Sequence, residues 1–111
     1  MSDKRRADRK AVDSIILVTD AITGQPVGRV GNLSGSGLML IGPKPLAEDA
    51  LYQFRFQLPN PNAGERRTLE IGMHEQWTEE AAIPGQFWSG LRFIAISEED
   101  TAALGAWLDS D

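Results

Sequence analysis

The sequence contains no cysteine and a single histidine, and both shortages narrow the functions open to the chain. Without cysteine there is no disulfide framework, no thiolate nucleophile and no thiolate metal site. His74, with Glu75 beside it, makes a poor transition-metal site because no second histidine or cysteine accompanies it. We therefore expect neither a bound metal nor another resident cofactor.

Long apolar runs are missing as well. No segment approaches the roughly 20 consecutive apolar residues that span a bilayer. Residues 1–10 are charged, whereas an export signal would join a basic tip to an apolar stretch. We expect no membrane insertion, and a cytoplasmic location is the simplest interpretation.

Catalytic groups are equally scarce. Ser34 and His74 are the only candidates for a nucleophile and its base, and nothing in the sequence orients one toward the other. We therefore expect a binding protein rather than an enzyme.

Charge is distributed unevenly along the 111 residues. Residues 1–10 hold five cationic and two acidic side chains, so this segment carries +3 and the remainder −8, within a net charge of −5. Such a cationic segment resists folding back on itself unless an anion neutralises it, and the acidic remainder would repel a nucleic acid duplex. We predict a flexible basic arm over residues 1–12 that binds a small anion, not nucleic acid.

Short extended segments separated by turn residues follow the arm and predict one domain over residues 13–111. β-Branched residues and period-2 alternation predict strands at 14–19, 27–33, 38–41, 51–58, 67–77 and 87–96, with a loop at 79–85. Ser97 is a suitable N-cap for a helix over 98–108. Its buried stripe would be Thr101, Leu104, Trp107 and Leu108. The fold predicted is mainly β, a six-stranded antiparallel β-barrel with a C-terminal α-helix.

Arginines in the arm suit an anionic, planar ligand. Arg5 and Arg9 stand four residues apart, and Arg6 follows the first of them. A guanidinium presents a planar fork of donors that binds phosphate oxygens or the O6 and N7 edge of guanine, and it also stacks on purines. The spacing alone is equally compatible with a solvated basic tail.

A polar turn lies between two of the predicted strands, at residues 32–37 (NLSGSG). Asn32 offers amide donors and a carbonyl acceptor, and Ser34 offers a hydroxyl. Gly37 permits either φ > 0 or a close approach of a ligand to the backbone. Placed between strands, these groups would stand at the rim of a barrel, where a ligand can reach them. An ordinary tight turn uses the same residue types, which is the structural alternative.

Taken together, the two motifs resemble those of the PilZ domains, a family of cyclic di-GMP receptors. In that family an Arg-x-x-x-Arg motif precedes the first strand, and Asp/Asn-x-Ser-x-x-Gly joins the second strand to the third. Residues 5–9 (RRADR) match the first motif and residues 32–37 match the second. Residues 88–93 (WSGLRF) are similar to the Gly-x-x-Phe strand common in the family. The resemblance covers nearly the whole chain.

The resemblance implies roles for individual residues. Arg5 and Arg9 would bind guanine edges and phosphates, and Arg6 would add a phosphate contact. Asn32, Ser34 and Gly37 would complete the site. Many family members have Asp at the Asn32 position, where a carboxylate accepts from both N1–H and the exocyclic amine of guanine, whereas Asn has one carbonyl oxygen.

Two further positions bear on the ligand. The residue before the first motif arginine helps to decide whether one ligand or an intercalated pair binds, and here Lys4 favours the pair. Trp77 stands where some family members contact the ligand, and its indole could stack on a guanine or on an arginine. The alternative is a tryptophan that belongs to the core or to the rim.

The resulting hypothesis is a receptor or adaptor: cyclic di-GMP orders the arm against the barrel and thereby changes a surface that a protein partner recognises. A nucleotide-independent PilZ-type docking adaptor is the second hypothesis. A nucleic-acid-binding barrel is the third, and the acidic body opposes it. Links to bacterial motility, biofilm formation or polysaccharide export are implied by the resemblance alone.

Overall fold

The computed structural model of the protein describes residues 10–11, 15–59 and 66–109. Its seven strands and one helix are β1 (Lys10–Ala11), β2 (Leu17–Asp20), β3 (Pro26–Leu33), β4 (Gly37–Gly42), β5 (Leu51–Pro59), β6 (Arg66–Glu80), β7 (Phe87–Ala95) and α1 (Glu98–Asp109). Within these ranges no helix is long and apolar enough to cross a bilayer.

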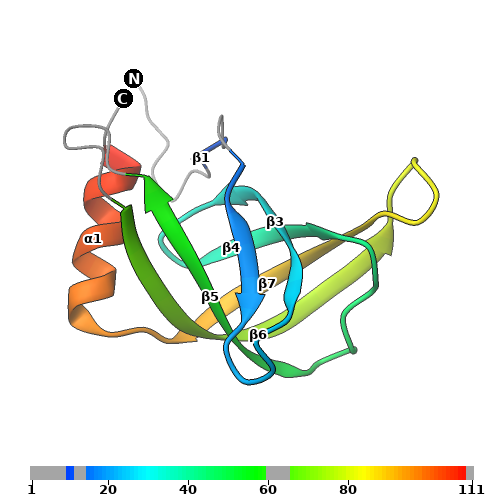
Figure 1. Cartoon of the computed structure of the whole chain (residues 1–111), viewed down its shortest axis with the longest axis horizontal. Coiled ribbons are helices and arrows are strands. Elements are labelled where there is room, and N and C mark those ends of the chain that lie inside the picture. Colours follow the sequence, from blue (N-terminus) through cyan, green and yellow to red (C-terminus); the bar gives the residue numbers. More distant parts are fainter. Residues whose placement is uncertain (1–9, 12–14, 60–65, 110–111) are drawn as a thin grey trace.

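Six of the strands close into an antiparallel barrel (Figure 1). Its order is β3-β2-β5-β6-β7-β4, and β4 pairs back on β3 to complete the ring. The two-residue β1 adds to β3 outside this ring. The predicted six-stranded antiparallel β-barrel with a C-terminal helix is therefore confirmed.

Apolar and polar residues alternate along the strands, so the apolar side chains point into the barrel. In β5, Phe54, Phe56 and Leu58 are buried, whereas Arg55 and Gln57 between them are exposed. Burying one such apolar side chain contributes about 1.5–3 kcal/mol. The core consists of Ile16, Val18, Val30, Leu33, Leu38, Leu40, Phe54, Phe56, Leu58, Leu69, Ile71, Met73, Leu91 and Leu104.

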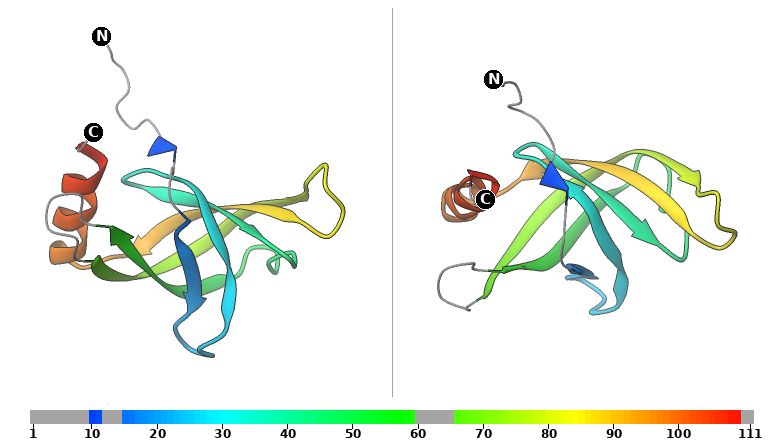
Figure 2. Two further views of the ribbon diagram at one scale, coloured as in Figure 1. Left: turned by 45° about the horizontal axis from the view of Figure 1, so that its top comes forward. Right: turned by 90° about the horizontal axis from the view of Figure 1, so that it is seen from above.

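The hairpin of β6 and β7 is longer than the sequence predicts. A loop was expected from Glu79, yet Glu79 pairs with Trp88 and Glu80 pairs with Phe87. Pairing between the backbones of β6 and β7 does not depend on hydrophobic alternation. It continues past Trp77, where the side chains of β6 no longer alternate between apolar and polar. Figure 2 shows this hairpin extending beyond the rest of the barrel, with its yellow loop at the tip.

Helix α1 begins at the N-cap that the sequence predicts. The Ser97 hydroxyl accepts a hydrogen bond from the Asp100 amide at 3.0 Å. The Asp100 carboxylate also bonds the guanidinium of Arg67 on β6 at 3.2 Å, which ties the helix to the barrel. Thr101, expected on the buried stripe, is exposed, and its hydroxyl donates to the Ser97 carbonyl at 2.8 Å. The face that packs on the core consists of Ala103, Leu104, Trp107 and Leu108.

Candidate ligand-binding site

Four of the predicted site residues lie in the described part of the chain. Asn32 is in β3, Gly37 begins β4, Ser34 is in the turn between these strands, and Trp77 is in β6. Lys4, Arg5, Arg6 and Arg9 lie outside the described residues.

Strand β1 connects the arm to the polar turn. Lys10 pairs with Leu33, and Ala11 pairs with Asn32. Arg9, the last arginine of the first motif, directly precedes Lys10 in the sequence. The arm is therefore attached at the end of β3 that carries Asn32, although some twenty residues separate the two motifs along the chain.

Asn32 and Trp77 belong to one row of residues across four strands. Asn32 on β3 pairs with Met39 on β4, Met39 pairs with Gly90 on β7, and Gly90 pairs with Trp77 on β6. Residues directly opposite each other in an antiparallel pair share a face of the sheet. The next row, Leu33, Leu38, Leu91 and Glu75, is buried, so the first row faces outward. We call Asn32, Met39, Gly90 and Trp77 the Asn32 row.

Trp77 lies against the backbone of β7 at Gly90. A Cβ atom placed on Gly90 would stand 2.2 Å from Trp77 Nε1, so only a glycine leaves room for the indole there. The side chain of Trp77 nevertheless stays 43% exposed. The outer surface of the barrel thus presents an accessible aromatic side chain in the same row as Asn32.

Asn32 is half-buried in this row. Its side-chain amide points to Met39 Sδ at 3.9 Å, a weak contact between neighbours of the row. The side-chain amide of Asn32 therefore lies beside Met39, the next residue of the row in the direction of Trp77.

Ser34 shapes the turn that follows Asn32. Its buried hydroxyl accepts hydrogen bonds from the amides of Ser36 and Gly37, each at 3.2 Å. The Ser34 amide in turn donates to the Gly37 carbonyl at 2.9 Å. These bonds give the motif serine a structural role in the turn, and its contact with a ligand stays a prediction.

Gly37 is required by the packing of β4 against β7. A Cβ atom on Gly37 would stand 2.2 Å from the carbonyl oxygen of Leu91, a backbone atom that cannot move without displacing its strand. Gly35, in the same turn, has nothing within 4 Å of such an atom. At Gly37, the close approach that the structure shows is that of β7 to β4, and the approach of a ligand stays a prediction.

His74 and Glu75 form polar contacts at the edge of this surface. His74 Nε2 lies 2.5 Å from Asp49 Oδ1, and His74 Nδ1 lies 2.6 Å from Gln76 Nε2. The buried Glu75 carboxylate accepts from the Asp49 amide at 2.8 Å. The two ring nitrogens of His74 therefore contact Asp49 and Gln76, and neither contacts Ser34, the candidate nucleophile. Across the described ranges no group of three or more His, Cys, Asp or Glu residues could hold a metal ion.

Sequence reasoning missed two residues at this surface. Gly90 was noted only as part of a strand motif, although it makes the room for Trp77. Arg92 was not singled out, yet it pairs with Gly37 of the turn and extends from the outer surface. The alternation of β7 could have placed both outward, but only the register of β7 against β4 and β6 places them beside the predicted site.

Comparisons with known proteins agree with this architecture. The model of the PilZ domain family matches residues 3–110 of the chain. No curated protein matches the sequence. The solved structure of the Bacillus subtilis inhibitor of motility (MotI/DgrA) is similar, with a TM-score of 0.75 and 16% identity over 96% of this chain. At this identity the likeness shows the fold, and the chain spans 49% of the length of that structure.

Proposed function

This chain belongs to the PilZ domain family, and we propose that it is a cyclic di-GMP receptor that carries its ligand on the Asn32 row. The observation that carries the proposal is the register of β1. It attaches the arginine-bearing arm beside Asn32, while Asn32 shares an outward row with Trp77. Cations, an amide and an accessible indole are groups that can bind the phosphates, the base edges and the base faces of a guanine dinucleotide.

Each group has a distinct role in the proposed complex. Arg5 and Arg9 bind guanine edges and phosphates, and Arg6 binds a further phosphate. The Trp77 indole stacks on a guanine ring, which its 43% exposure permits. Asn32 binds a guanine edge, and Ser34 and Gly37 hold the turn that positions it. Lys4 adds a charge that favours an intercalated pair of ligands.

The consequence proposed for binding is an ordered arm. The ligand neutralises the cations of the arm and contacts the barrel at the same time, so the two are held together only in the bound state. A protein partner that recognises the arm against the barrel would then distinguish bound from free receptor. No step of this process requires chemistry on the ligand, so the protein acts as a receptor or adaptor and not as an enzyme.

Calorimetry on the full chain tests the proposal. We expect cyclic di-GMP to bind the unaltered protein, with a stoichiometry of one or two, and Arg9→Ala to weaken binding by roughly 10-fold or more. Arg66→Ala is the matched control, because Arg66 is exposed and lies eleven residues before Trp77 on β6. Backbone NMR on the same samples should show shifts at residues 1–9 on binding.

Two results would contradict the receptor hypothesis. One is the absence of any heat or spectral change with cyclic di-GMP, which would leave a nucleotide-independent docking adaptor. The other is an equal loss of affinity in Arg9→Ala and Arg66→Ala, because that would indicate nonspecific attraction between charges.

A further inference from the structure

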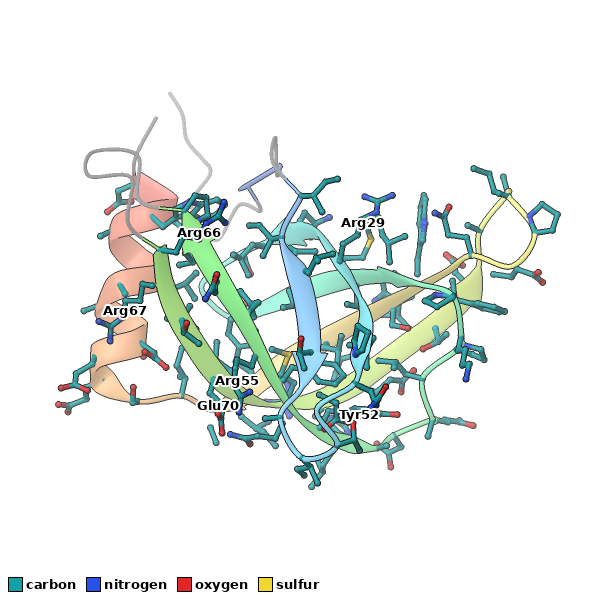
Figure 3. The ribbon with its side chains drawn as sticks, viewed as in Figure 1. Arg29, Tyr52, Arg55, Arg66, Arg67 and Glu70 are labelled. Atoms are coloured by element: carbon teal, nitrogen blue, oxygen red, sulfur yellow. The ribbon has the colours of Figure 1, made fainter. Side chains whose placement is uncertain are left out.

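Arg92 is a cation at the proposed site that belongs to neither motif. It lies on β7, where it pairs with Gly37 on one side and with His74 on the other. The side chain is exposed. In the described part of the chain, Arg55 and Arg67 form ion pairs with Glu70 and Asp100, both at 3.2 Å, whereas Arg92 forms none (Figure 3 shows Arg55 beside Glu70).

The position of Arg92 on β7 brings it within reach of the Asn32 row. Gly90 and Arg92 are two residues apart on one strand, so both face outward and their Cα atoms are separated by about 6.6–6.8 Å. Trp77 lies over Gly90. An arginine side chain is long enough to cross that separation, so its guanidinium can meet a ring that stacks on Trp77.

Strand β4 separates Arg92 on β7 from Asn32 on β3. Gly37 of β4 pairs directly with Arg92 and contributes no side chain at that position. Strands β3 and β7 flank β4, at about 4.7–4.9 Å on either side. The arm is attached on the β3 side, and Arg92 approaches from the β7 side.

We propose that Arg92 is a further ligand-binding residue, whose guanidinium binds a phosphate or the O6 and N7 edge of a guanine in cyclic di-GMP. The inference rests on the proposed function and extends it to a fixed cation on the barrel. A guanidinium can hold either group through two parallel hydrogen bonds. The ligand would then be held between cations of the arm on one side and Arg92 on the other.

The test compares single-charge deletions in the full chain by calorimetry with cyclic di-GMP. We expect Arg92→Ala and Arg92→Gln to weaken binding by roughly 10- to 100-fold, the range for hydrogen bonds to a charged group. One control removes the same charge elsewhere: Arg66→Ala, on the first residue of β6 (Figure 3). This control should change affinity by less than about 3-fold at physiological salt.

The possible results distinguish a failure of this inference from a failure of the proposed function on which it rests. If the unaltered protein does not bind cyclic di-GMP, the proposed function fails. If it binds and Arg92→Ala loses no more affinity than Arg66→Ala, the function stands and the role of Arg92 is refuted. A thermal melt of each variant identifies losses caused by unfolding, and Arg92→Gln, which keeps the side-chain length, provides a second folded variant.

Discussion

Replacing Gly37 by alanine should destabilise the barrel itself. The added Cβ would stand 2.2 Å from the Leu91 carbonyl oxygen and 3.3 Å from its carbon. Both are backbone atoms of β7, so no change of rotamer relieves the contact. Strands β4 and β7 must separate at the end of the ladder where Gly37 pairs with Arg92.

The expected loss of stability has two parts, the steric contact with the Leu91 backbone and the weakened pairing of β4 with β7. Overpacking a well-filled site costs about 1–3 kcal/mol. Each ladder hydrogen bond that lengthens removes a further ~0.5–1.5 kcal/mol. We expect Gly37→Ala to lower the free energy of unfolding by about 3 kcal/mol, a fall of roughly 12 °C in Tm for a domain of this size.

Circular dichroism melts of Gly37→Ala and Gly35→Ala provide the measurement. Gly35 lies in the same turn with nothing within 4 Å of an added Cβ, so its variant should stay within about 0.5 kcal/mol of the unaltered protein. Equal melting temperatures for the two variants would refute the reasoning, since the motif glycine would then be unnecessary for packing. Loss of ligand binding in Gly37→Ala should be interpreted only from samples shown to be folded.

Three smaller perturbations test other contacts. Ser34→Ala leaves two turn amides without their acceptor and should cost about 1–2 kcal/mol in urea denaturation; an unchanged midpoint would contradict the role of the hydroxyl in the turn. Gly90→Ala meets the Trp77 side chain and not backbone, so the tryptophan should move, with red-shifted fluorescence and weaker cyclic di-GMP binding; an unaltered emission spectrum would argue against the packing described. Ser97→Ala removes the N-cap of α1 and should cost about 1 kcal/mol, measured by thermal melting, and no loss would show that the Asp100 amide finds another acceptor.

Local patterns predicted the six strands of the barrel and the helix, but not the two-residue β1. Alternation predicted the inward side chains of β5, and Ser97 as an N-cap predicted where α1 begins. The six strands and the helix were confirmed for this reason. The end of β6 was not predictable, because Glu79 and Glu80 have no apolar face and are held in the ladder by Trp88 and Phe87 of the partner strand.

The site was only partly predictable. The two motifs indicated the residues of the arm and the turn, but the alignment of Trp77 with Asn32 depends on the register of four strands. That register shifts between Val30 and Asn32 and again between Glu75 and Trp77. Such irregularities arise from packing between segments distant in the sequence, and no local pattern encodes them. Arg92 and Gly90 escaped notice for the same reason.

The two-residue strand β1 also sets the reach of the arm. A chain extends at most about 3.6 Å per residue, so the Cα of Arg5 can lie no farther than about 18 Å from that of Lys10. Because Lys10 pairs with Leu33, every arginine of the first motif stays within that distance of the residue that pairs with the end of β3. Tethering of this kind gives effective concentrations in the millimolar range for short linkers. In the proposed complex, the arginines of the arm would therefore reach a ligand on the barrel at an effective concentration that does not depend on the amount of protein.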